Sequence, residues 1–427
     1  MTSTGSPGAR RRRHGCASVA TDGASRDWSS LPAELLLCVF ALLLSDADRV
    51  RFRAVCRRWA SAAGAWRPRP WLVGSRTDRS GQGAATSSFW LSRAGRLLPF
   101  PAEIPPGLEY LSSSSHGYLV LSDPSRAGPG GGKAITLLNP STGRRVPLPP
   151  IGFFKKWHDV HTVVLSADPA MSGGGEWTAV ASAFPANCLA YYCSAAGVWT
   201  ALNFRVTGYV GVEHFRGRFY VAFKRNIYVL VHDLNQRGGQ PVLPLGDAVE
   251  GDFPGAGGRK DYDFPGGRAS AVDTHLVESE GQLLLVWVRG GDGYSSDDDL
   301  RDYDNVIVGD DDELEVVTRS NNRRTVEVHR VELVGDGAVR LEPVYSLGAG
   351  RCALFLGRNR AFTLSPAEFP ACRANCVYLL DRQGHPNGVV TVLNVERSCK
   401  ETIYPEEGLR GWTSAGWARR GWFFANY

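Results

Sequence analysis

The spacing of apolar residues changes once along the chain, near Arg67. Before this point apolar residues recur at helical intervals, with Leu35, Val39, Leu42 and Leu43 at positions i, i+4, i+7 and i+8. This spacing places them on one face of an α-helix. The sequence therefore predicts a helix here, followed by a part of the chain with a different architecture.

Local sequence signals mark where this first helix begins and ends. Ser29 and Ser30 are candidate caps, and Pro32 and Glu34 suit a first turn, where proline and acidic residues are favoured. The polar pair at residues 45–46 predicts a joint and the start of a second helix.

The second predicted helix also has one apolar face. Phe52, Val55, Cys56 and Trp59 lie at i, i+3, i+4 and i+7, and arginines occupy the other side. A unit of about forty residues cannot bury so much apolar surface by itself. We therefore expect this helical unit to dock on another protein.

The same stretch carries a motif that resembles the F-box. The Leu-Pro pair of that family stands at Leu31-Pro32, its acidic position at Glu34 and its leucine pair at Leu35-Leu36. The late Arg-x-Val-Cys-x-x-Trp signature runs from Arg53 to Trp59. The match covers about a tenth of the chain, with both ends at the proper separation. An unrelated amphipathic helical hairpin is the alternative.

The resemblance implies a three-helix F-box module over residues 27–66 that binds a Skp-type adaptor and, through it, a cullin-RING ligase. Some apolar residues of the motif, Trp59 above all, are expected to hold the module's own helices together. The predicted adaptor-contact residues are Leu31, Pro32, Leu35, Leu36, Val39, Val55, Cys56 and Trp59.

After Arg67 short aromatic and β-branched runs replace the helical spacing, which predicts β-strands. Three clear runs each follow a polar residue and a glycine: His116-Gly117, Arg216-Gly217 and Glu280-Gly281. Predicted partner strands follow them at residues 135–138, 227–231 and 326–333, and a fourth pair comprises residues 376–381 and 388–394.

The predicted hairpins recur along the whole second part of the chain. The glycines that open them, Gly117, Gly175, Gly217, Gly281 and Gly357, are 58, 42, 64 and 76 residues apart. A loose repeat of sheet hairpins is typical of a β-propeller. We therefore predict an all-β domain over residues 67–427, a propeller of six or seven blades, with a pair of β-sandwiches as the alternative.

The second part also resembles one plant family, F-box proteins with a C-terminal, kelch-like propeller long known as a domain of unknown function. The landmarks are residues 353–357, residues 376–381, the pair Trp412 and Trp417, and the Asn-Pro-x-Thr-Gly turn at residues 139–143. Each landmark alone is weak, but together they span most of residues 70–427.

Charge is distributed unevenly. The net charge of +5 is small for 427 residues, so it supports no nucleic-acid partner. Residues 1–26 are basic and are expected to form a disordered tail, whose run Arg10–Arg13 is open as a nuclear signal, a transit signal or a solvated tail. Insertions near 124–133, 251–268 and 289–325, the last strongly acidic, are expected to be disordered loops.

The nine cysteines are odd in number and irregularly spaced, so we expect buried free thiols in a reducing compartment. No apolar run approaches the ~18 residues that a membrane span needs. The sequence therefore predicts a protein of the cytoplasm, the nucleus or both, without a membrane partner.

No nucleophile or phosphate-binding motif is complete. Residues 128–133 superficially resemble a phosphate-binding loop, but Ala134 follows the lysine where Ser or Thr is needed. No Gly-x-Ser-x-Gly elbow occurs. We expect no catalytic residue.

Candidate metal ligands are equally incomplete. His158 and His161 would face opposite sides of a strand, and Cys372 and Cys376 lack a second pair of ligands. The acidic residues of the last insertion lack the register of a calcium loop. We expect neither a metal nor a cofactor.

The sequence thus favours a non-catalytic adaptor, the substrate-recognition subunit of an SCF-type E3 ubiquitin ligase, whose propeller binds an unidentified protein substrate through residues that the sequence does not indicate. One alternative is a propeller scaffold in a signalling or transcriptional complex with a ligase-independent role. Another is an enzyme that uses the central funnel of the propeller, which would need a cluster of inward-facing polar residues.

Overall fold

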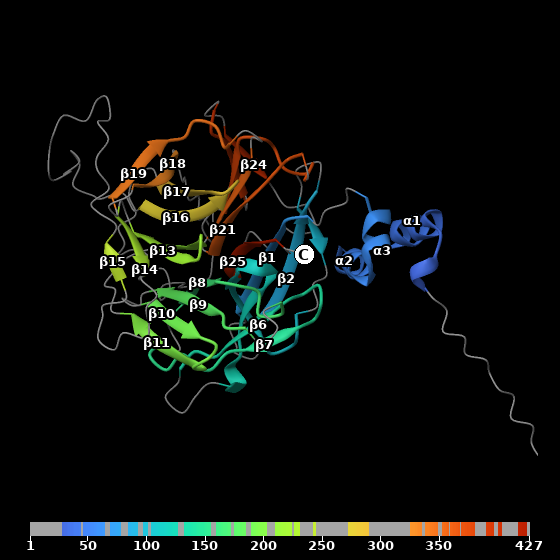
Figure 1. The fold of residues 1–427 in the computed structure, drawn as a ribbon, viewed down its shortest axis with the longest axis horizontal. Helices are drawn as coiled ribbons and strands as arrows, with labels where there is room; N and C mark the ends of the chain where they lie inside the picture. Colours follow the sequence, from blue (N-terminus) through green and yellow to red (C-terminus); the bar gives the residue numbers. More distant parts are fainter. Residues whose placement is uncertain are drawn as a thin grey trace, which may run out of the picture.

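Two parts of different architecture make up the chain, a small helical module and a larger all-β domain (Figure 1). The structure, a computed structural model, describes residues 28–43, 46–64, 69–77, 84–92, 97–100, 104–126, 132–154, 159–171, 175–184, 189–202, 210–223, 226–230, 242–244, 272–289, 325–334, 338–348, 352–357, 359–367, 369–380, 390–396, 400–403 and 417–424. The predicted basic tail, residues 1–26, lies outside them.

The helical module contains a 3₁₀ turn, η1 (Trp28–Ser30), and three helices, α1 (Ala33–Leu42), α2 (Asp46–Val55) and α3 (Arg57–Ala62). The N-cap of α1 is Pro32, without a side-chain hydrogen bond, so the predicted serine caps are wrong. The single face predicted from Phe52 to Trp59 is also wrong. Cys56 adopts an extended backbone, with φ −166° and ψ 169°, and divides α2 from α3.

The strands that the structure describes form six sheets. The first comprises β25 (Trp417–Phe423), β1 (Trp71–Thr77), β2 (Ala84–Leu91) and β3 (Leu97–Phe100). The second comprises β4 (Glu109–Ser113), β5 (Leu119–Ser122), β6 (Ile135–Leu138) and β7 (Arg145–Pro147). The third comprises β8 (Asp159–Leu165), β9 (Thr178–Phe184), β10 (Leu189–Cys193) and β11 (Val198–Leu202).

The remaining three sheets follow the same plan, with one exception. The fourth comprises β12 (Gly211–Phe215), β13 (Arg218–Phe223), β14 (Asn226–Leu230) and β15 (Val242–Pro244). The fifth comprises β16 (Val272–Ser279), β17 (Gln282–Arg289), β18 (Thr325–Val334) and β19 (Ala338–Pro343). The sixth has the order β21 (Asn359–Leu364), β20 (Ala353–Gly357), β22 (Cys376–Leu380), β23 (Val390–Asn394) and β24 (Lys400–Ile403).

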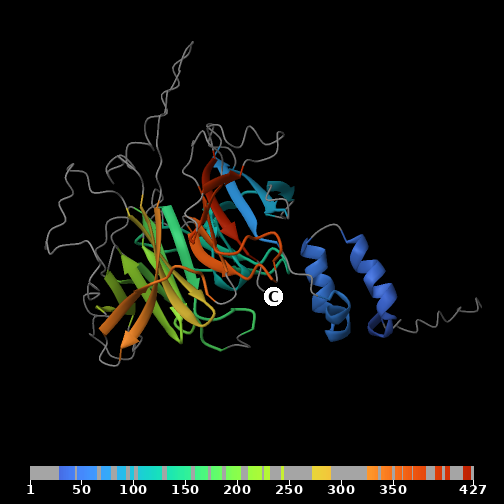
Figure 2. The same ribbon diagram turned by 90° about the horizontal axis from the view of Figure 1, so that it is seen from above.

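The sheets are arranged radially around a common centre (Figures 1 and 2). Their first strands contact one another in a closed ring, in the order β25, β4, β8, β12, β16, β21 and back to β25. This arrangement is a β-propeller rather than a pair of β-sandwiches. The predicted architecture, a short helical module followed by an all-β propeller, is confirmed.

The ring closes by pairing the two ends of the propeller segment. Strand β25 pairs antiparallel with β1, and Trp422 lies opposite Leu72 in the register. Both side chains are fully buried, and the Trp422 indole donates a hydrogen bond to the Tyr378 carbonyl over 3.2 Å. Of the two predicted closing tryptophans, Trp417 begins β25 and Trp412 lies outside the described residues.

Three of the predicted polar-glycine pairs form equivalent tight turns. Their first residues have positive φ, 57° at His116, 47° at Arg216 and 50° at Glu280, and the glycines that follow do too. Two successive positive φ values are typical of the turns that connect twisted antiparallel strands. A left-handed conformation costs a non-glycine residue about 1–2 kcal/mol. Gly357, the last of the five glycines predicted to open a hairpin, differs, because it ends β20 instead of opening a strand.

The sixth sheet explains that exception. Its inner strand, β21, follows β20 in the sequence but lies inside it, and β20 pairs in parallel with β22. The predicted pairing of residues 376–381 with 388–394 is confirmed as β22 with β23. The pairings β5–β6, β13–β14 and β17–β18 confirm the other three predicted hairpins.

The predicted insertions fall largely on residues that the structure does not describe. At the first insertion, however, Pro124–Arg126 form a 3₁₀ turn and Lys133 forms a bridge with Ile151. Lys133 is buried, so the prediction of a disordered loop is wrong at these two edges. The second insertion lies outside the described residues. So does the acidic one apart from its end residues, Arg289 and Thr325, which pair in β17 and β18, so the predicted loop is shorter at both ends.

We predict that Gly421→Ala destabilises the propeller by about 1–3 kcal/mol or more, because overpacking a filled core forces its neighbours apart. A methyl group at Gly421 in β25 would collide with the Tyr110 hydroxyl and lie 3.0 Å from Asn359 Cγ. Urea denaturation measures the change. Gly152→Ala is the matched control, since a methyl group there meets nothing within 4 Å. Equal losses in both variants would contradict the prediction.

A second prediction concerns His275 in β16. Burial lowers the pKa of this imidazole to about 4, and the ordinary value of 6.5 applies to the unfolded chain. Between pH 6.5 and pH 4 this imidazole is therefore mostly protonated in the unfolded chain and mostly neutral in the folded protein. The free energy of unfolding should fall as the pH decreases from about 6.5 towards 4, by up to about 1.4 kcal/mol per pH unit from this group. Urea denaturation at several pH values should show a shallower decline in His275→Gln; parallel curves would contradict this.

Candidate functional site

The helical module has a small core of its own. Leu36, Phe52 and Ala63 are buried together, and Phe40 and Trp59 pack against them. The Phe52 ring lies 5.2 Å from Phe40 and 4.5 Å from Trp59, measured between ring centroids. Helices α1, α2 and α3 thus share one apolar centre.

Helix α1 presents a second apolar stripe to solvent. Leu35, Val39 and Leu42 lie at i, i+4 and i+7 and are 51%, 38% and 79% exposed, whereas Leu36 on the adjacent stripe is 0% exposed. An exposed apolar patch of this kind marks an interaction surface. Of the ten exposed large hydrophobic side chains among the described residues, six belong to this module: Trp28, Leu35, Leu37, Val39, Leu42 and Val55.

The structure divides the predicted adaptor-contact residues into two groups. Pro32, Leu35, Val39 and Val55 are exposed, whereas Leu31, Cys56 and Trp59 are partly buried and Leu36 is fully buried. A contact through Leu36 would require its side chain to leave the module core. As expected for Trp59, its side chain helps to hold the module together. The indole N–H donates a hydrogen bond to the Trp28 carbonyl over 3.0 Å.

Sequence reasoning left two exposed leucines, Leu37 and Leu42, out of the contact set. Leu42 shares the helical stripe of Leu35 and Val39, so its spacing was a usable signal. Leu37 lies off that stripe, and its exposure depends on how α1 sits on the other two helices.

One arginine joins the module to the propeller, whose relative positions are visible in Figure 2. Arg51 in α2 donates a hydrogen bond from Nε to the Ser141 carbonyl over 3.0 Å, while its Nη1 lies 2.9 Å from Asp48. Arg57 and Arg58 at the start of α3 are exposed beside Val55. The exposed surface of the module therefore carries basic as well as apolar side chains.

The turn that receives Arg51 is the predicted tight turn at residues 139–143. The Asn139 side-chain oxygen accepts hydrogen bonds from the backbone N–H groups of Ser141 and Thr142, over 3.0 and 3.1 Å. Gly143 closes the turn with φ 71°, a conformation that favours glycine. The asparagine thus shapes the loop whose carbonyl Arg51 contacts.

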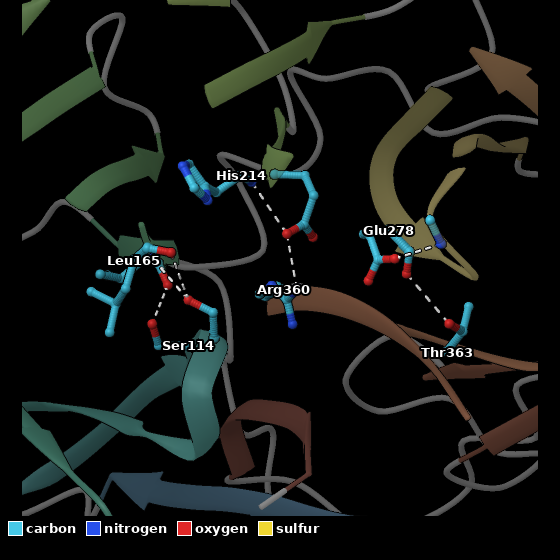
Figure 3. A network of polar contacts seen from close by, with 10 residues as sticks. Ser114, Leu165, His214, Glu278, Arg360 and Thr363 are labelled. Atoms are coloured by element: carbon cyan, nitrogen blue, oxygen red, sulfur yellow. Dashed lines mark hydrogen bonds and ion pairs between the residues drawn. The ribbon is translucent and has the colours of Figure 1, made fainter. Parts of the chain in front are cut away.

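A separate polar cluster lies where the inner strands meet (Figure 3). Arg360 in β21 forms an ion pair with Glu213 in β12, with Nη2 and Oε1 2.8 Å apart. The Glu213 side chain is 1% exposed and that of Arg360 is 18% exposed. The pair links two sheets that are not neighbours in the ring.

Two serines anchor the turn that carries His116 beside this pair. The Ser114 hydroxyl donates to the Val163 carbonyl over 2.6 Å. The Ser115 hydroxyl donates to the Leu165 carbonyl and accepts from the Leu165 N–H, over 3.2 and 2.8 Å (Figure 3). The turn is therefore held against β8 in a defined position.

Burial dominates the electrostatics of this cluster. Burial lowers the pKa of His116 and His214, and the positive charge of Arg360 lowers both further. Burial raises the pKa of Glu213, and the Arg360 guanidinium opposes that shift. The cluster thus holds one ion pair and two imidazoles that favour the neutral form. Sequence reasoning missed it, because Glu213 and Arg360 lie 147 residues apart.

The residues of the incomplete phosphate-binding and metal-binding motifs have separate structural surroundings. The backbone N–H of Lys133 donates to the Ile151 and Phe154 carbonyls, His161 is buried in β8, and His158 lies outside the described residues. The six described cysteines are free, and one of them, Cys38, is exposed instead of buried as expected. No group of three or more metal-ligating side chains occurs among the described residues, and no described helix is long and apolar enough to cross a membrane.

Solved structures of low sequence identity resemble the chain. A protein from Lactobacillus plantarum is 13% identical, with 84% of this chain and 99% of that chain covered and a TM-score of 0.37. The N-terminal domain of Nup159 is 10% identical, with 82% and 89% covered and a TM-score of 0.28. An alpha-L-arabinofuranosidase from Clostridium thermocellum is 10% identical, with 61% and 83% covered and a TM-score of 0.26. These low scores carry no functional argument.

Comparison with protein families is more informative. No curated protein matches the chain. Residues 28–67, which include all three helices of the module, match the F-box-like domain, in agreement with the motif in α1 to α3. Residues 92–399, most of the propeller, match the family described as KIB1-4 beta-propeller. The chain therefore belongs to the KIB1-4 beta-propeller family, with an F-box-like domain preceding the propeller.

Proposed function

We propose that this protein is the substrate-recognition subunit of an SCF-type E3 ubiquitin ligase, in which the F-box binds a Skp-type adaptor and the propeller binds a protein substrate. The observation that carries the proposal is the exposed stripe Leu35, Val39 and Leu42 on α1 of an F-box-like domain. Burial of one such side chain contributes about 1.5–3 kcal/mol. Val55, 54% exposed, adds an exposed apolar side chain at the end of α2.

Proximity is the proposed mechanism. The receptor holds a substrate lysine near an E2 enzyme that carries ubiquitin, and this raises the effective concentration of the reacting groups. No side chain of the receptor takes part in bond making. The Arg51 contact with Ser141 supports this role, because it ties the adaptor-binding module to the substrate-binding domain.

We also infer that each of the six sheets is one blade, which gives a six-bladed propeller.

The plant F-box resemblance of the sequence leads us to propose a plant origin. The exposed thiol of Cys38 fits a reducing compartment, so we propose the cytoplasm, the nucleus or both as the location. Membranes and nucleic acids are not proposed as partners.

The adaptor contact is tested with Leu35→Asp. We expect binding to a purified Skp-type adaptor to weaken by at least about tenfold, because a carboxylate replaces an apolar side chain at the interface. Isothermal titration calorimetry measures the affinity. The matched control is Leu333→Asp in β18, where the leucine is 42% exposed, and it should bind like the wild type.

A second matched pair extends this test to α2. Val55→Asp should also weaken binding, and Val198→Asp should not, although the two valines are 54% and 55% exposed. Circular dichroism must show that the Asp variants keep their helices. A folded Leu35→Asp variant that binds the adaptor as tightly as the wild type would overturn the proposed contact.

Deletion of residues 27–66 separates a ligase subunit from a scaffold with a ligase-independent role. For a ligase subunit, we expect adaptor binding to be lost and proteins bound by the propeller to accumulate in cells. Proximity labelling with the full chain and the deletion variant identifies those proteins, and quantitative mass spectrometry follows their levels. Unchanged levels of every labelled protein would instead favour the scaffold.

A further inference from the structure

The helical module and the propeller are joined by a short stretch of chain (Figure 2). The described part of the module ends at Gly64, and the next described segment begins at Arg69. An extended chain of this length reaches at most about 18 Å. Such a tether limits the distance between the two parts, but it does not by itself set their orientation.

Arginine side chains anchor both ends of this stretch. Arg53 Nη1 in α2 donates a hydrogen bond to the Gly64 carbonyl over 3.2 Å, which holds the end of the module to its second helix. On the propeller side, the Arg69 guanidinium lies over the Trp90 ring, 4.3 Å from its centroid, in an attractive cation–π contact. The stretch therefore begins and ends at defined points.

Arg51 adds a contact between the two parts, and it uses two edges of its guanidinium. Nε donates to the Ser141 carbonyl over 3.0 Å, and Nη1 lies 2.9 Å from the Asp48 carboxylate. Asp48 precedes Arg51 by three residues in α2, so the ion pair holds the guanidinium along the helix surface. A planar guanidinium satisfies both partners at once, whereas a lysine ammonium lacks this fixed fork.

The carbonyl that receives Arg51 belongs to a turn that is itself anchored. At the end of this turn, Arg144 Nη2 donates to the carbonyl of Pro169, which lies between β8 and β9, over 3.2 Å. Ser141 is 0% exposed, although Thr142 beside it is exposed. The contacts therefore connect α2 to the second sheet and, through Arg144, to the third.

The strength of the Arg51 contact is moderate, because the side chain is 46% exposed. A hydrogen bond of this kind changes an equilibrium by about fivefold. Domains that lack a large interface move relative to one another by default. Between parts that a short tether already keeps close, a fivefold preference makes one orientation the main one.

We propose that Arg51 is a positioning residue, which holds the helical module in one main orientation on the second sheet. The consequence rests on the proposed function: an adaptor bound to Leu35 and Val39 extends from the substrate-binding domain in a defined direction. A defined direction keeps a substrate lysine near the E2 enzyme, as catalysis by proximity requires. The orientation itself is a property of this chain and needs no partner.

Double electron–electron resonance measures the orientation in the full chain. Spin labels on unnatural amino acids at Ser61 in α3 and Ala196 in the turn before β11, both exposed, avoid the native cysteines. With Arg51 in place we expect one dominant distance between the labels. In Arg51→Met the ratio of this population to all others should fall by about fivefold, because the hydrogen bond to Ser141 is lost.

Matched variants assign the effect to the guanidinium. Arg57→Met removes an exposed arginine of α3 that forms no hydrogen bond or ion pair with the described residues, and it should leave the distances unchanged. Arg51→Lys keeps the charge without the fork, so it should restore the dominant population only in part. Asn139→Ala loosens the receiving turn and should lower the same population, although the module is unaltered. Circular dichroism must show that each variant is folded.

A folded Arg51→Met variant with the same distance distribution as the wild type would overturn the proposal. So would a broad distribution in the wild type, or an equal change in Arg57→Met. The adaptor contact fails separately, because Leu35→Asp should keep the dominant distance and Arg51→Met should bind the adaptor like the wild type. Unweakened adaptor binding in Leu35→Asp therefore overturns the proposed contact and leaves the positioning role in place.

Discussion

The pairing of β25 with β1 is the constraint on which the propeller depends. It joins the last described strand to the first, so the ring has no open gap at this point. The contact buries Trp422 and Leu72 completely, and no space remains for a methyl group at Gly421. Because β1 begins shortly after α3, the closure also determines where the F-box-like module leaves the ring (Figure 1).

Helix α1 carries both a buried apolar face and an exposed apolar face, to which we assign the proposed adaptor contact. Neighbouring stripes lie on different sides of the helix, with Leu36 buried in the module core and Leu35 half exposed. The leucine pair of the motif is therefore divided between two roles. Substitution of Leu36 would disturb the module, at a typical cost of about 2–5 kcal/mol for a buried leucine, whereas substitution of Leu35 probes binding.

The propeller centre contrasts with the apolar layers between the sheets. Glu213 and Arg360 bring opposite charges together inside the ring, where a single unpaired charge would be strongly destabilising. The cluster draws on β12, β21 and the turn before β5, three places far apart in the sequence.

The sequence by itself determined the features that depend on local spacing. Apolar intervals and the F-box motif located the helices, and polar-glycine pairs such as His116-Gly117 located the hairpins. The break at Cys56 was missed, because no proline or glycine marks it. Only the tertiary structure decided that Leu36 is buried, that β21 lies inside β20, and that Arg360 meets Glu213. Those outcomes depend on contacts between distant residues, which local periodicity cannot encode.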